Sequence, residues 1–376
     1  MLAVQARPDT LQALGTACGL KGKVIALHGA LQQRYPSIDR LALALYEAST
    51  GRLRTFLQSQ AGEPPLSLYE TLLEDAPALA ALLETRAARV VQDLSVYDAG
   101  VRPHTRALRA QGYGSSYTLP FYWNGNLEAF VFFNSHEKGR FPEELLGELD
   151  AWGHLVGTLA LCELGAVRAL MAALRTANTM VHMKDPETGG HLERMAHFSR
   201  LIARHLSMTG KHPFDDETIE HIFAFAPLHD VGKIAVPDAV LMKTGALNGP
   251  EWQVMQRHPA AGLELIDAIL RHFGAEHLEH VDLLRHVAES HHEMMDGSGY
   301  PGHLSGAAIP IVARIIAVAD IFDALTSHRP YKEPWTNQEA FDYLRRQSEH
   351  KLDRDCVEAL IQGREEVERI QALFRE

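Results

Sequence analysis

The stretch Phe225-Ala-Pro-Leu-His-Asp-Val-Gly-Lys-Ile234 places two adjacent polar residues, His229 and Asp230, directly after an apolar segment. Transition metals bind imidazole nitrogen and carboxylate oxygen, and a carboxylate has two oxygens that can bridge a pair of ions. Adjacent helical positions differ by about 100°, so both side chains reach one site only if they lie near its centre. This stretch therefore predicts the centre of a metal site on a helical scaffold.

Further candidate ligands lie at wide intervals on both sides of this pair. Asp320 stands in the apolar run Ile315-Ile-Ala-Val-Ala-Asp-Ile-Phe322, where a buried carboxylate needs a partner that a metal would supply. A single histidine is usually a hydrogen-bonded core or surface residue, and His221 and His280 are interpreted in that way. The complete set exceeds what one ion needs and indicates a multinuclear metal site that hydrolyses a phosphate ester. Its members are Glu187, His191, His229, Asp230, His258, His291, His292 and Asp320.

The expected chemistry follows from the charge of a phosphodiester. Two ions about 4 Å apart provide a hydroxide at neutral pH and neutralise the charge that develops during hydrolysis. Lys233, one turn after Asp230, is placed to contact a nonbridging phosphate oxygen. The alternative for Lys233 is a solvated lysine at a helix end.

The second half of the chain reads as helical. Gly189-Gly190 precedes a helix that we expect to start near His191, and Asn248 with Glu251 predicts a capping box. Ligands that are spread over several helices and converge inside a bundle are an established way to build a dimetal site. The stretches expected to be helices are 217–231, 250–272, 279–292 and 310–327.

The first half reads as a mixed α/β domain. The short apolar segments 41–46 and 53–57 predict a hairpin. A second hairpin is predicted from 116–123 and 127–134, which flank Asn124-Gly-Asn126, because Asn-Gly favours the tight turn between paired strands. Helical patterns are expected near residues 26–34, 67–85 and 142–183.

The last of these helices carries an apolar stripe with three- and four-residue steps. The stripe predicts a homodimer seam in the helix 146–183, which would pass a signal from the first domain to the second. The alternative is a helix packed on its own domain, and Glu163 interrupts the seam. The stripe comprises Leu149, Trp152, Val156, Leu159, Val167, Leu170, Leu174 and Val181.

Composition excludes several classes of protein. The net charge of -12 argues against a nonspecific nucleic-acid binder, and no apolar run approaches the ~18 residues of a membrane span. Cys18, Cys162 and Cys356 are far apart and suggest neither disulfides nor a thiolate metal site. Residues 1–8 lack the features of a secretory signal. We expect a reduced, cytoplasmic protein that binds neither DNA nor membrane.

Two resemblances extend this reading. Residues 20–160, with Gly114-Ser-Ser116, the second hairpin and its Phe132-Phe-Asn-Ser135 end, resemble a GAF sensory domain. Residues 175–365 resemble the HD-GYP family through His229-Asp-Val-Gly-Lys233 and His291-His-Glu-Met-Met-Asp-Gly-Ser-Gly-Tyr-Pro301, with a third match at Asp320–Lys332. Members of that family are all-helical phosphodiesterases of the HD superfamily that hydrolyse cyclic di-GMP.

The second resemblance implies roles for individual residues. The family's metal ligands fall on the histidines and aspartates named above, and Glu187 occupies the place of the extra ligand in three-metal members. Two or three divalent ions are therefore implied, iron or manganese. Asp230 and Lys233 are the implied catalytic residues. Tyr300 can stack on guanine or merely pack, Arg329 and Lys332 hold the second phosphate or form a plain basic loop, and Asp296 and Asp323 orient the ligands or the loop.

The expected fold class is an α+β GAF-like domain over residues 1–145, joined by the helix 146–183 to an all-α HD-type bundle over 184–376. The expected function is metal-dependent hydrolysis of cyclic di-GMP to pGpG, with a second cut giving GMP, under control of an unknown small ligand of the GAF-like domain. Two alternatives stay open. One is a phosphohydrolase acting on another cyclic dinucleotide or nucleotide, and the other is a catalytically weak receptor that binds cyclic dinucleotides and signals through a protein partner.

Overall fold

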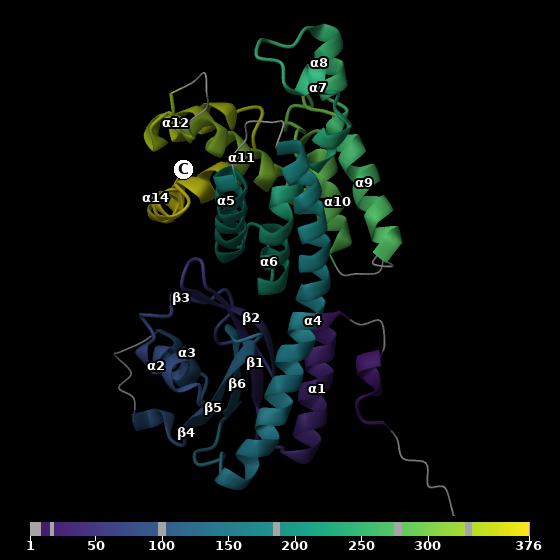
Figure 1. Ribbon diagram of the computed structural model, residues 1–376. Helices are drawn as coiled ribbons and strands as arrows, with labels where there is room; N and C mark the ends of the chain where they lie inside the picture. Colours follow the sequence, from purple (N-terminus) through teal and green to yellow (C-terminus); the bar gives the residue numbers. More distant parts are fainter. Residues whose placement is uncertain are drawn as a thin grey trace, which may run out of the picture. The chain divides into compact units, whose positions relative to one another are not determined.

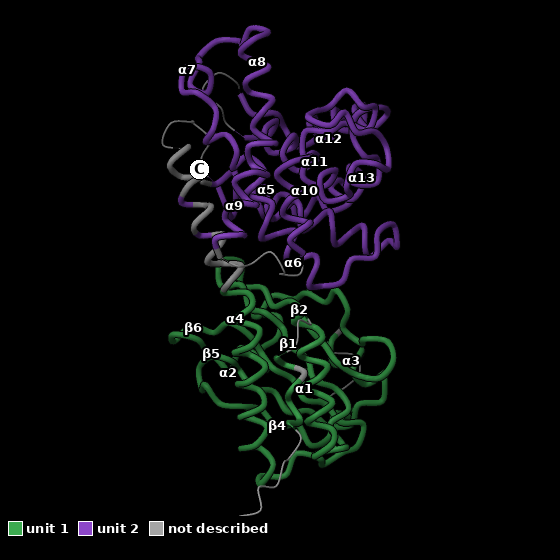
Figure 2. Tube along the Cα trace, turned by 90° about the vertical axis from the view of Figure 1, so that its right-hand side faces the viewer, with its two compact units in different colours: residues 1–165 green, residues 166–376 purple. Residues whose placement is uncertain are grey.

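The computed structural model describes residues 9–15, 19–96, 103–182, 189–273, 280–327 and 333–375. It divides the chain into two compact units, residues 1–165 and 166–376 (Figure 2). The division falls inside the segment 146–183 that the sequence suggests as a linker. Glu187, Arg329 and Lys332 lie outside the described residues.

The first unit is built on one six-stranded antiparallel sheet (Figure 1). The strand order is β3-β2-β1-β6-β5-β4. The two central hairpins match the sequence expectation, and the turn residues Asn124 and Gly125 have φ values of 48° and 85°, as a tight hairpin turn requires. The strands are β1 (Arg40–Glu47), β2 (Arg52–Gln60), β3 (Glu70–Leu72), β4 (Arg89–Val91), β5 (Ser115–Trp123) and β6 (Asn126–Ser135).

Helices cover both faces of this sheet. On one face α1 (Leu20–Arg34) and the first half of α4 (Glu143–His182) pack against Leu41, Val131 and Phe133. On the other face α2 (Pro77–Thr85) packs against Ala44 and Phe130. Successive strand residues point to opposite faces, so two covered faces explain why the central strands are apolar throughout. The remaining elements are η1 (Gln12–Gly15), η2 (Leu94–Val96) and α3 (Pro103–Ala110).

The structure describes the side chains of only the first four residues of the apolar stripe on α4. Leu149 and Val156 are fully buried, and Trp152 and Leu159 pack against the same core as the sheet. The first part of the stripe therefore belongs to its own domain, which is the alternative to a dimer seam. The structure does not describe the side chains of Val167, Leu170, Leu174 and Val181.

The second unit consists of helices, and among its described residues the only β pairing is the isolated bridge between Asp296 and Ser305. The all-helical expectation is confirmed for this part. Its elements are α5 (Gly189–Met208), α6 (Asp216–Phe225), η3 (Ala226–Leu228), η4 (Val231–Ala235), α7 (Asp238–Leu241), α8 (Gly249–Met255), α9 (His258–Phe273), α10 (Val281–Ser290), η5 (Gly306–Ala308), α11 (Ile311–Thr326), α12 (Asn337–Gln347), α13 (Arg354–Gln362) and α14 (Arg364–Leu373).

Three expected helices are wrong in their extent. The stretch 217–231 is α-helical only to Phe225, because Pro227 lacks an amide hydrogen and its ring crowds the preceding turn. The stretch 250–272 is two helices, and Pro259 lies in the first turn of the second, where proline is favoured. Within 67–85, residues 70–72 pair with β2, and the helix begins only at Pro77. The capping box of Asn248 and Glu251 is confirmed.

No helix among the described residues is both long enough and apolar enough to cross a membrane.

Candidate metal centre

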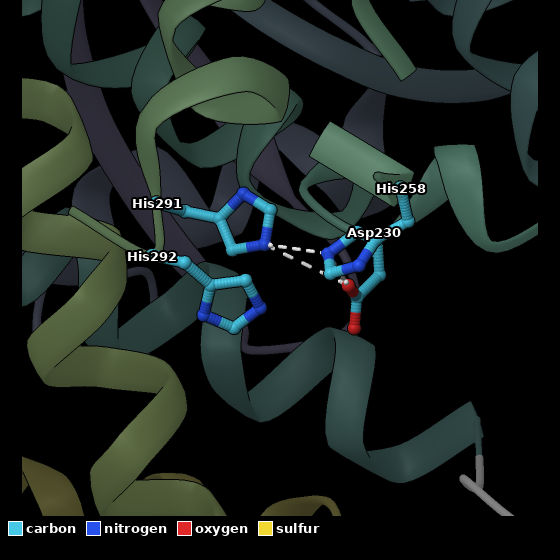
Figure 3. Close-up of side chains that lie close together, drawn as sticks. All are labelled: Asp230, His258, His291 and His292. Atoms are coloured by element: carbon cyan, nitrogen blue, oxygen red, sulfur yellow. Dashed lines mark hydrogen bonds and ion pairs between the residues drawn. The ribbon is translucent and has the colours of Figure 1, made fainter. Parts of the chain in front are cut away.

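Seven of the eight expected metal ligands come together in the second unit, as two neighbouring groups. Within each group, one possible ligand atom per residue lies within 4.8 Å of every other. The first group, cluster A, is His191, His229 and Asp320. The second, cluster B, is Asp230, His258, His291 and His292 (Figure 3). The eighth, Glu187, lies outside the described residues.

Most of these ligands stand at the ends of helices. His191 is in the first turn of α5, His258 is the first residue of α9, and His291 and His292 directly follow α10. His229 and Asp230 occupy the turn between η3 and η4. The proline that ends α6 therefore also sets the backbone that presents this doublet, which is not on an α-helix as the sequence suggests.

Asp230 lies between the two clusters. Its Oδ2 is 3.3 Å from His229 Nε2 in cluster A. Its Oδ1 is 3.1 Å from His258 Nε2 and 3.6 Å from His291 Nε2 in cluster B. In cluster A, Asp320 Oδ1 is 3.9 Å from His191 Nε2 and 4.0 Å from His229 Nε2. A carboxylate with one oxygen toward each group has the geometry of a bridging ligand.

The histidine tautomers suit a metal. His258 Nδ1 donates to the Met255 carbonyl at 2.8 Å, and His291 Nδ1 donates to the Val287 carbonyl at 3.0 Å. In neutral rings this leaves each Nε2 with a lone pair, yet the two Nε2 atoms face each other at 3.3 Å. Two lone pairs at that distance repel unless a cation lies between them. The donor set of cluster B therefore fits a metal ion, and its nitrogen and oxygen ligands fit iron, manganese or zinc.

The surroundings of these groups keep them in the protonation states that metals bind. It lowers the pKa of His291 and holds the pKa of His292 well below its ordinary value, so both rings are neutral at pH 7. Burial alone would raise the pKa of Asp230. Lys233 and the neighbouring imidazoles of His229 and His258 outweigh that effect and hold this pKa well below its usual range. Neutral imidazole and ionised carboxylate are the forms that bind metals.

Gly232 allows the two backbones of the centre to approach closely. A Cβ atom at this position would lie 1.9 Å from the His258 carbonyl oxygen and 2.4 Å from the Gly262 nitrogen. Only glycine fits where η4 meets the start of α9, and this contact sets the distance between Asp230 and His258.

Asp323 orients His191, a ligand of cluster A, through a hydrogen bond. It is buried and accepts a hydrogen bond from His191 Nδ1 at 2.8 Å, which directs the ring's Nε2 toward Asp320. Arg194 donates to both oxygens of Asp323, at 2.7 and 3.1 Å. Burial alone would raise the pKa of Asp323, but these two partners lower it. Sequence reasoning missed Arg194, whose place one turn after His191 on α5 was the available signal.

The loop after His292 is fixed by its own carboxylates. Glu293, which sequence reasoning also missed, is buried and accepts hydrogen bonds from the amides of Gly302 at 2.5 Å and Leu304 at 2.9 Å. Asp296 accepts from the Ser298 amide at 2.9 Å and lies in neither metal cluster. The Tyr300 ring lies 4.7 Å from the ring of His292, between centroids. The aromatic surface of Tyr300 therefore adjoins cluster B.

Lys233 lies beside the bridging carboxylate. Its Nζ is 2.8 Å from Asp230 Oδ2, and its side chain is largely buried. This is the one basic residue of the expected substrate contacts that the structure describes, since Arg329 and Lys332 fall in the segment 328–332.

Residues 175–356 match the family model described as HD domain. This part of the chain is an HD domain. The match begins within α4, ends in α13 and includes every ligand of clusters A and B.

Curated relatives align with the same half of the chain. The cyclic di-GMP phosphodiesterase response regulator RpfG of Xanthomonas campestris is 44% identical over 52% of this chain and 48% of its own length. A cyclic di-GMP phosphodiesterase of Vibrio cholerae is 34% identical over 54% and 42%. The 3'3'-cGAMP-specific phosphodiesterase 2 of that organism is 36% identical over 51% and 34%. The chain spans less than half of the length of each of these relatives.

The first unit is similar to solved GAF domains. The GAF region of a putative membrane protein from Geobacter sulfurreducens is 16% identical, with a TM-score of 0.31 over 38% of this chain and 92% of that one. The phycocyanobilin-bound GAF domain of a cyanobacterial phytochrome is 20% identical, with a TM-score of 0.30 over 40% and 86%.

Proposed function

We propose that the chain is a metal-dependent phosphodiesterase that hydrolyses cyclic di-GMP. The observation that carries this proposal is Asp230, with one carboxylate oxygen toward each of two clusters of buried ligands. Seven protein ligands in two adjoining groups fit two ions, and a pair of bound ions supplies a nucleophile at neutral pH and neutralises charge on the phosphate. Relatives named as phosphodiesterases of cyclic dinucleotides support the substrate class.

The side chains around the centre bind the phosphates and the bases of the substrate. Lys233, already beside Asp230 Oδ2, neutralises a nonbridging phosphate oxygen when substrate displaces part of that ion pair. Tyr300 offers an aromatic surface next to His292 on which a guanine base can stack. Arg329 and Lys332 hold the second phosphate of the cyclic dinucleotide. Addition of water across one phosphodiester bond gives linear pGpG, and a second cut gives GMP.

The number of ions is part of the proposal. Glu187 is the candidate ligand of a third ion, with iron as the metal and manganese as the alternative. The protein purified without oxygen then holds more than two ions per chain, and Glu187→Ala loses about one. Equal metal content in the two proteins would remove Glu187 from the ligand set.

A second substrate is favoured by a specific observation, since three of the relatives are named for 3'3'-cGAMP. That molecule has the same two phosphates and exchanges one guanine for adenine, so the metal centre treats both alike. The choice between them depends on contacts to the bases. Other nucleotide phosphates and the role of a catalytically weak receptor are the further alternatives.

The first unit is proposed as a GAF-like regulatory domain with a small ligand. Its sheet encloses a cavity of about 50 Å³ lined by Arg40, Tyr69 and His104, among others. Arg40 is buried, and its guanidinium donates to the amide oxygens of Asn134 at 2.7 Å and Gln58 at 3.0 Å. Burial lowers the pKa of Arg40 to about 10. A small ligand would bind in this domain, and a homodimer through the later part of α4 would carry its signal.

The deciding experiment is turnover by the purified full chain, loaded with Fe(II) or Mn(II) without oxygen. Cyclic di-GMP and 3'3'-cGAMP are supplied in parallel, and the products are separated by chromatography, with Asp230→Ala as the inactive control. Faster formation of pGpG supports the proposal. Faster cleavage of cGAMP supports the second substrate, and tight binding of either dinucleotide by the fully metallated protein without turnover supports the receptor.

A further inference from the structure

A third group of metal-ligating side chains lies in the second unit, outside the centre described above. Glu217 and His221 are four residues apart on α6, and His280 directly precedes α10. One possible ligand atom from each lies within 4.8 Å of the other two, the same closeness found within clusters A and B. We call these three residues the distal cluster.

The three side chains are placed to bind one ion together. Glu217 and His221 are buried and project from the same face of α6, since residues four apart on a helix are neighbours. The rings of His221 and His280 lie 4.4 Å apart between centroids, with 33° between their planes. Two imidazoles and a carboxylate are the protein ligands of many three-ligand zinc sites.

The His221 ring has the tautomer that a metal requires. Its Nδ1 donates to the Glu217 carbonyl oxygen at 2.8 Å, so Nε2 carries the lone pair. Metal-bound histidines are commonly oriented by such a hydrogen bond from the other ring nitrogen.

The backbone at His280 supplies a second, independent observation. His280 has φ 66° and ψ 10°, the left-handed conformation that side chains other than glycine rarely adopt. Its side chain makes no capping hydrogen bond to α10. A strained backbone is kept where the surrounding structure needs that side chain in one place, and here the ring is held against His221.

We propose that the distal cluster binds one divalent transition metal ion of the zinc class through Glu217, His221 and His280, with water completing the coordination. The absence of a thiolate and the mixture of nitrogen and oxygen donors fit zinc, cobalt or nickel better than calcium or magnesium.

The position of this site gives it a structural role. α6 and α10 pack against each other, and the distal cluster joins the first two turns of α6 to the residue that precedes α10. His229 and Asp230 follow α6 after the three residues of η3, and His291 and His292 follow α10 directly. The ion therefore clamps the starts of two helices, each of ten residues and about 15 Å long at 1.5 Å per residue, that lead toward ligands of the catalytic centre.

The test measures zinc in the full chain, stripped with a chelator and dialysed against micromolar Zn²⁺. The variants are Glu217→Gln, His221→Ala and His280→Asn, the last because asparagine tolerates the left-handed backbone. The matched control is His272→Ala, an exposed helical histidine with the same type of hydrogen bond, from Nδ1 to the Ala268 carbonyl at 3.0 Å. Far-UV circular dichroism confirms that each variant is folded.

The wild type and His272→Ala are expected to hold one zinc ion per chain more than the three distal variants. Zinc is also expected to raise the Tm of the wild type more than that of His280→Asn, because one of the two helices is no longer clamped. Equal zinc content in all five proteins would overturn the proposal, and so would equal zinc-induced shifts in Tm. Neither measurement depends on which nucleotide the catalytic centre cleaves.

Discussion

Gly232→Ala adds a single methyl group at the point where the backbones of η4 and α9 meet. The new Cβ would lie 1.9 Å from the His258 carbonyl oxygen, and Cβ atoms essentially never lie closer than 3.0 Å to another heavy atom. The obstructing atoms belong to backbone, so no side-chain rotation relieves the contact. The two segments must therefore separate by about 1 Å, an overpacking that costs on the order of 1–3 kcal/mol.

That displacement acts directly on cluster B. His258 and Asp230 lie on opposite sides of the junction, with 3.1 Å between His258 Nε2 and Asp230 Oδ1. Metal–ligand distances tolerate only about 0.2 Å, so a shift of about 1 Å removes one of the two from a shared ion. We expect Gly232→Ala to lose metal and most turnover, and to lower the Tm by about 2–12 °C at 2–4 °C per kcal/mol for a unit of this size.

The assay combines metal content by mass spectrometry, turnover of cyclic di-GMP and thermal unfolding. Gly262→Ala is the matched control, because its Cβ would face the same junction with a nearest contact of 3.3 Å, to the Gly232 nitrogen. Gly249→Ala, with nothing within 4 Å, gives the baseline for an added methyl group. Wild-type metal content and turnover in Gly232→Ala would refute the reasoning that this glycine sets the distance between the ligands.

Four further variants test the roles of side chains in and around the metal centre. Asp323→Ala leaves the buried guanidinium of Arg194 without its carboxylate. We expect a loss of about 3–5 kcal/mol in the free energy of unfolding and of about 10–100-fold in metal affinity. Denaturation curves and metal titrations equal to those of the wild type would contradict this. Asp230→Ala should abolish hydrolysis and most metal binding, whereas Lys233→Ala should keep the metals and lose roughly 10²–10³ in kcat. A metal-free Lys233 variant would show that its role is structural. Neutralising Arg329 and Lys332 together should raise KM for cyclic di-GMP and leave kcat unchanged. Hydrolysis of bis(p-nitrophenyl) phosphate, which has one phosphate, should be nearly unaffected. An equal loss of activity on both substrates would place the pair in the catalytic centre.

Much of the fold was predictable because its signals are local. The two apolar segments and the Asn124-Gly125 turn between them specify the β5–β6 hairpin within residues 115–135. The helix boundaries were less accessible, since the prolines at 227 and 259 interrupt apolar patterns that otherwise continue. A proline ends or starts a helix through its effect on the backbone of the preceding turn. The spacing of apolar side chains does not reveal where this happens.

The sequence by itself determined which residue types are available to a metal centre. It supplies the polar pairs His229-Asp230 and His291-His292, and it places Asp320 in an apolar run where a carboxylate is costly without a partner. The tertiary structure decided how they are grouped. It placed His291 and His292 in one cluster, and it set Asp230 between the two clusters.

Only the tertiary structure brought together residues whose meeting has no local signal. Arg194 and Asp323 are separated by 129 positions, and His221 and His280 had been interpreted as ordinary core or surface histidines. Each of these pairs forms because packed helices bring distant positions together. Helical periodicity shows which face of a helix is buried, but the neighbour that this face meets depends on the packing of the whole bundle.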